Sequence, residues 1–111
     1  MKRYIKAGTD GWNPESILSV LKSYEGDYHN KSTDWTGYVT IEQTKSDAAA
    51  DNFAWEIQYH GTNRSSSDST DITWEGGRVF ILPNIGSVHL CNNMSEFRSG
   101  LRSEFSGMNR V

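Results

Sequence analysis

The chain has 111 residues and a formal net charge of −3, and 35% of its residues are hydrophobic. This length fits a single domain over residues 1–111, and four Trp, five Tyr and four Phe can supply its core, which argues against two domains and against disorder. No apolar run approaches the roughly 20 residues of a membrane-spanning helix, and an acidic chain lacks the clustered basic surface that nucleic-acid binding needs.

The clearest local signal is the start of a helix near the N-terminus. Asn13 suits an N-cap and Pro14 suits the first helical position. Trp12 precedes the cap and Ile17 lies four residues beyond it, which is the spacing of a hydrophobic staple. Apolar residues then recur every three or four positions, so we expect a helix over residues 14–25.

Strands are predicted where apolar and polar residues alternate or where β-branched residues gather. The strongest signal is residues 53–60, in which Phe53, Trp55, Ile57 and Tyr59 fall on one face. Weaker signals predict strands at residues 3–7, 38–44, 72–74, 79–82 and 87–91. The polar residues 27–36 and 61–70 are predicted as loops, the second of them mobile, and Gly76-Gly77 is predicted as a tight hairpin turn.

A second helix is predicted from near Asn92 or Asn93 to Gly107. Its apolar stripe is spaced by three and four residues and consists of Met94, Phe97, Leu101, Phe105 and Met108. Gly100 costs this helix about 1 kcal/mol relative to Ala, so either another element packs closely there or the helix is marginal. The stripe can pack on its own sheet or on a second copy, which leaves a homodimer open.

These elements together predict an α+β fold, in which an antiparallel sheet of three to five strands carries an N-terminal and a C-terminal helix packed on one face. His29, His60 and His89 lie too far apart along the chain for a zinc motif. Cys91 is the only cysteine, so no internal disulfide can form and a cytoplasmic location is favoured. We predict no cofactor, no bound metal and no enzymatic activity.

Two alternatives use the polar face of the predicted sheet. Glu56, Gln58 and His60 share this face of one strand, and Glu42 can reach it from the neighbouring strand. These four residues could bind a small molecule or a nucleotide. A weaker alternative is a metal-dependent hydrolase built on Glu42, Glu56 and His60.

The leading hypothesis follows from the distribution of charge. Residues 7–75 hold twelve acidic and four basic side chains, a net charge of −8, whereas residues 76–111 carry +2. Acidic loops keep a domain soluble, and they also fit the basic surface of a protein partner. The predicted partner contacts are the loop over residues 61–70 together with six acidic residues and one tryptophan: Asp27, Asp34, Trp35, Asp47, Asp51, Asp68 and Asp71.

On this hypothesis the chain is a small intracellular protein-binding domain that acts by occluding a surface of its partner. Occlusion would be steric, or the acidic loops would mimic a nucleic acid in a basic groove. Small acidic domains without a catalytic constellation are typical of phage-encoded inhibitors of host defence, anti-CRISPR proteins among them. The suggestion rests on the small size, the acidic charge and the lack of a catalytic constellation, and no sequence motif carries it.

Overall fold

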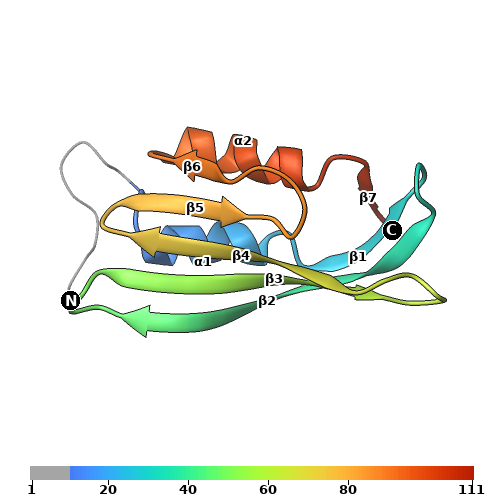
Figure 1. Cartoon of the computed structure of the whole chain (residues 1–111), viewed down its shortest axis with the longest axis horizontal. Coiled ribbons are helices and arrows are strands. Elements are labelled where there is room, and N and C mark those ends of the chain that lie inside the picture. The colour runs from blue at the N-terminus through green and yellow to red at the C-terminus, as the bar shows by residue number, and fades with distance from the viewer. Residues whose placement is uncertain (1–10) are drawn as a thin grey trace.

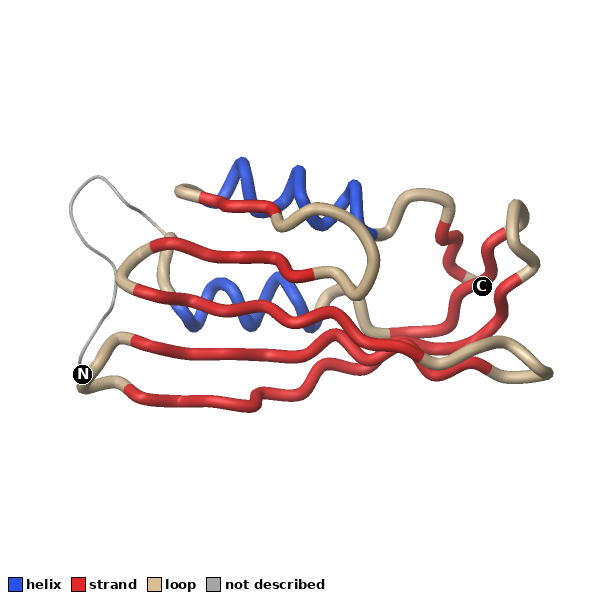
Figure 2. The backbone as a smooth tube through the Cα atoms, in the orientation of Figure 1, coloured by secondary structure: helices blue, strands red, loops and turns tan. Residues whose placement is uncertain are grey.

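The computed structural model describes residues 11–111, which form a curled antiparallel sheet with two helices inside its curl (Figure 1). The elements in chain order are α1 (Pro14–Lys22), β1 (Gly26–Asn30), β2 (Trp35–Asp47), β3 (Asn52–Gly61), β4 (Asp68–Glu75), β5 (Arg78–Leu82), β6 (His89–Cys91), α2 (Met94–Glu104) and β7 (Met108–Arg110). The strand order is β6-β5-β4-β3-β2-β1-β7, and each strand is antiparallel to its neighbours. The backbone tube in Figure 2 shows how far strands outweigh helices.

The predicted α+β fold, with a sheet of three to five strands and two flanking helices, is wrong. The sheet has seven strands and curls like half a barrel, whereas the helices have only nine and eleven residues. The strand β1 and the first two residues of β2 occupy most of residues 27–36, which the polar sequence predicted as a loop. The strand β7 replaces the end of the predicted second helix, so Met108 belongs to a strand. Both strands were missed because neither has an alternating pattern.

Tertiary contacts explain why β1 and β7 form. The strand β1 pairs with β2 on one side and with β7 on the other, so its backbone groups have partners along both edges. The Arg110 guanidinium of β7 lies 5.1 Å from the centroid of the Tyr28 ring of β1. The same guanidinium donates hydrogen bonds to the carbonyls of Ser23 and Glu25, just after α1. The end of the chain is thus held in the sheet by contacts that a local pattern cannot predict.

The local signals at the helix start and at one turn are confirmed. Asn13 Oδ1 accepts a hydrogen bond from the Ser16 amide at 2.9 Å, and α1 begins at Pro14, although it ends at Lys22, earlier than predicted. Gly76 and Gly77 have φ angles of +57° and +91°, as the tight turn between β4 and β5 requires. The strand predicted at residues 3–7 lies outside the described residues.

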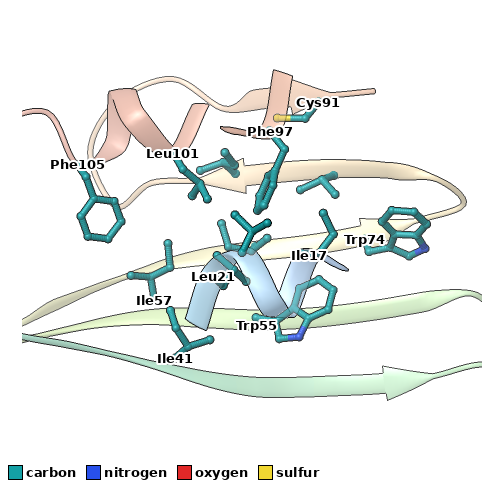
Figure 3. Close-up of a cluster of buried hydrophobic side chains, with 14 of the residues drawn as sticks. Ile17, Leu21, Ile41, Trp55, Ile57, Trp74, Cys91, Phe97, Leu101 and Phe105 are labelled. Carbon is teal, nitrogen blue, oxygen red and sulfur yellow. The ribbon is translucent and has the colours of Figure 1, made fainter. Parts of the chain in front are cut away.

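The core fills the inside of the curl. Trp55 and Ile57 of β3 are 1% and 0% exposed, and they face the helices across the core (Figure 3). Phe97 and Leu101 of α2 are buried in the same core together with Phe105, the residue after the helix, so this stripe packs on its own sheet. A Cβ at Gly100 would lie 2.7 Å from Ile81 Cδ1, so the glycine permits α2 to approach β5 closely.

The helices leave one end of the sheet uncovered. Figure 1 shows that β1, β7, the β1–β2 turn and the β3–β4 loop extend past the ends of both helices. The molecule is correspondingly elongated, with extents of 45 × 24 × 23 Å. We call this part, beyond the ends of the helices, the open end of the sheet.

Candidate binding site

The residues of the predicted ligand face do come together on the outer side of the sheet. Glu42 pairs with Glu56, and Thr40 with Gln58, in the register of β2 and β3. Gln58 Nε2 donates to Glu42 Oε1 at 2.7 Å and to Glu56 Oε1 at 2.8 Å, while Thr40 Oγ1 lies 2.7 Å from His60 Nε2. The polar groups of this face thus bind one another, and their binding of a ligand stays a prediction.

The seven predicted partner-binding residues are spread over three places. Asp27 and Asp71 lie on the outer face, where they pair in register with outer-face residues of β2 and β3. Asp47 and Asp51 flank the β2–β3 turn. The carboxylate of Asp47 accepts a hydrogen bond from a turn amide at 3.1 Å, and that of Asp51 accepts one from Trp74 Nε1 at 2.9 Å. These two aspartates therefore stabilise local structure.

The other three, Asp34, Trp35 and Asp68, line one cleft of about 750 Å³ at the open end of the sheet. Tyr59, Arg64 and Glu104 line it as well, and we call this group of six residues the acidic cleft. These residues come from the β1–β2 turn, the start of β2, β3, the β3–β4 loop, the start of β4 and the end of α2. The volume lies within the roughly 300–1,000 Å³ that is usual for ligand pockets.

The indole of Trp35 is fixed in the wall of the acidic cleft by two contacts. It lies across Gly37, because a Cβ on this glycine would be 2.6 Å from an atom of the indole ring. Trp35 Nε1 also donates a hydrogen bond to the Ser66 carbonyl at 2.7 Å, which ties the ring to the β3–β4 loop. An aromatic surface is therefore in place before any ligand arrives.

The β3–β4 loop holds Arg64 in an unusual backbone conformation. Asn63 and Arg64 have φ angles of +50° and +76°, and the Ser65 amide donates to the Thr62 carbonyl at 2.9 Å, as in a type I′ turn. The second central position of such a turn favours glycine, so arginine there is strained. The Arg64 side chain is exposed and, among the described residues, forms no ion pair.

Glu104, the last residue of α2, presents a carboxylate that neutral donors hold in place. Its Oε2 accepts hydrogen bonds from Tyr59 Oη at 2.6 Å and from Thr70 Oγ1 at 2.7 Å. Burial, together with the hydrogen bond to Glu104, raises the pKa of Tyr59 far above its usual value. The Tyr59 hydroxyl therefore stays protonated and keeps donating to the carboxylate.

The sequence did not predict Tyr59 or Glu104 as site residues, and it included Arg64 only as part of the predicted contact loop over residues 61–70. The alternation of β3 assigned Tyr59 to the core, which it does contact. Glu104 lies 45 residues from Tyr59 and 34 from Thr70, so no local pattern joins them. The polar loop over residues 61–70 was the one sequence signal that led toward this part of the cleft.

Neither a metal site, nor a membrane-spanning helix, nor a similar protein is found for the described part of the chain. In residues 11–111, no group of three or more His, Cys, Asp or Glu is arranged to hold a metal ion, so Glu42, Glu56 and His60 do not form one. The same part of the chain contains no helix with the length and apolar character for crossing a membrane. Comparison with protein-family models, with curated proteins and with solved structures finds no match.

Proposed function

We propose that the chain is a protein-binding domain that binds a positively charged surface of a protein partner through its acidic cleft and thereby blocks that surface. One observation carries the proposal: the carboxylates of Asp34, Asp68 and Glu104 line the same cleft although they are far apart in the sequence. Asp34 pairs with His29 Nε2 at 3.0 Å, and within residues 11–111 none of the three carboxylates forms an ion pair with Lys or Arg. The cleft is thus left with negative charge for a partner to neutralise.

The physical parts of a binding surface are present at this end of the molecule. Exposed carboxylates attract a basic surface over a distance and orient it on approach. Trp35 offers a rigid aromatic contact, which is the type of residue that contributes most to the binding free energy of an interface. A partner held here through a basic groove would lose access to its nucleic acid, which is how an inhibitor of host defence would act.

The test is to capture binding proteins from a cell lysate on the immobilised chain and to purify the captured protein. Its dissociation constant is then measured with the wild type and with two double variants. Asp34→Asn with Asp68→Asn removes two charges from the acidic cleft, and Asp27→Asn with Asp71→Asn removes two from the outer face. A nucleic acid that the partner binds is added in a competition arm.

We expect the cleft variant to bind about tenfold more weakly at low salt, and the outer-face variant to bind within twofold of the wild type. The difference should shrink at high salt because the charges are exposed. Equal weakening by both variants, or binding that is insensitive to salt and to both variants, would contradict the proposal. Unchanged binding in the presence of the nucleic acid would remove the inhibitor mechanism alone.

A further inference from the structure

Glu104 is a carboxylate that has no cationic partner within residues 11–111. It is half-buried, and both of its hydrogen-bond donors, Tyr59 and Thr70, are neutral. It is also the last residue of α2, where the helix dipole places partial negative charge. Glu104 Oε1 accepts no hydrogen bond from the rest of the described chain. The site therefore gains free energy when a cation with N–H donors reaches this oxygen.

The other walls of the acidic cleft select the kind of cation. Trp35 presents an aromatic ring that is already fixed by Gly37 and Ser66, and an indole face attracts cations more strongly than other aromatic rings. Asp68 adds a second carboxylate to the lining. A guanidinium is planar, so it can stack on an indole and still direct its N–H groups to carboxylates at its edge. An ammonium group is a compact point charge and lacks this combination.

From these contacts we infer that the acidic cleft is a receptor for one arginine side chain of the protein partner, with the guanidinium on Trp35 and its N–H groups donating to Glu104 Oε1. The inference rests on the proposed function, because the arginine belongs to the basic surface of the partner. Arg64 is the one cation that residues 11–111 place in the lining, and its positive charge opposes an incoming guanidinium. It thereby limits the affinity of the site.

The test uses two amino-acid probes whose termini are blocked and therefore uncharged. Their side chains differ at one heavy atom, a nitrogen in one and an oxygen in the other. N-acetyl-L-arginine amide carries the guanidinium, whereas N-acetyl-L-citrulline amide replaces it with a neutral urea of the same shape. Each probe is titrated into the isotopically labelled full chain, and the indole N–H signal of Trp35 is followed by NMR. The Trp35→Phe variant assigns that signal.

Three variants examine the roles of the charges. Glu104→Gln keeps an oxygen for Tyr59 and Thr70 but removes the charge. Glu75→Gln makes the same change at an exposed position at the opposite end of β4. Arg64→Gln removes the opposing charge.

We expect the arginine probe to shift the Trp35 signal with a dissociation constant on the order of 1 mM, and the citrulline probe to leave it in place. Glu104→Gln should weaken binding about tenfold, Glu75→Gln should not change it, and Arg64→Gln should strengthen it severalfold. An equal response to citrulline, or full binding by a folded Glu104→Gln variant, would overturn the inference.

The outcomes also separate this inference from the proposed function. If a partner is captured through the acidic cleft but the arginine probe leaves Trp35 unshifted, the arginine receptor is wrong and the protein-binding function stands. If the probe binds as expected but no partner depends on Asp34 and Asp68, the protein-binding function is wrong. The cleft would then be a site for a free guanidinium compound.

Discussion

The close approach of α2 to the sheet at Gly100 makes a prediction with a definite sign. In an exposed helix, Gly→Ala stabilises by about 1 kcal/mol. Here the new Cβ would lie 2.7 Å from Ile81 Cδ1, about 1 Å inside normal contact, and Ile81 is fully buried. Overpacking of this kind costs about 1–3 kcal/mol. We therefore expect Gly100→Ala to lower the free energy of unfolding by about 1 kcal/mol.

A double-mutant cycle isolates the steric part of this effect. Ile81→Val removes the δ-methyl group and by itself costs about 0.5–1.5 kcal/mol. The remaining neighbours of the new Cβ are then Cys91 Sγ at 3.7 Å and His89 Cβ at 3.9 Å, which are ordinary contacts. Gly100→Ala should now stabilise by about 1 kcal/mol, which gives a coupling energy of about 2 kcal/mol.

Urea unfolding of the four chains, followed by tryptophan fluorescence and by circular dichroism, measures each free energy. Additive effects, with a coupling energy below about 0.5 kcal/mol, would refute the close packing of Gly100 against Ile81. Stabilisation by Gly100→Ala alone would refute it as well.

Three further predictions concern the acidic cleft and the buried thiol. Arg64→Gly should raise the free energy of unfolding in urea by about 0.5–1 kcal/mol, because it relieves the positive φ, and no gain would show that the turn is unstrained. Gly37→Ala should lower the free energy of unfolding by at least about 2 kcal/mol in the same assay and shift the Trp35 indole signal, because the new Cβ meets the indole and the neighbouring strand. A decrease below about 0.5 kcal/mol would contradict that packing. Burial raises the pKa of the Cys91 thiol to about 11, whereas an unfolded thiol titrates near about 8.5, so stability should fall as pH rises from about 8.5 through 11. Urea midpoints at pH 8 and pH 10 should show a steeper fall for the wild type than for Cys91→Ala, and equal slopes would contradict the raised pKa.

Local sequence signals predicted the elements whose cause is local. The Asn13 cap, the Gly76-Gly77 turn and the alternation of β3 each depend on a few neighbouring residues, and each is present. The strands β1 and β7 depend on pairing across the sheet and on contacts of Arg110 with the end of α1. The contact of Arg110 with Glu25 joins residues 85 positions apart, and the pairing of β7 with β1 is similarly long-range, which is why the last strand and the curl were not predicted.

The candidate site was predicted in part for the same reason. Asp34, Trp35 and Asp68 stood out as exposed acidic and aromatic residues in polar segments, and all three line the acidic cleft. Nothing in the sequence indicated that they, rather than the other predicted contacts, would converge. Glu104 reaches the site only because α2 ends beside β3 and β4, where Tyr59 and Thr70 donate to it.

The most direct test of the account is a structure of the chain in complex with its captured partner. We predict that the partner covers the open end of the sheet and inserts an arginine between Trp35 and Glu104, with Asp34 and Asp68 at the rim of the contact. A partner seated on the outer face, over Glu56 and its neighbours, with the acidic cleft left empty, would contradict the central claim.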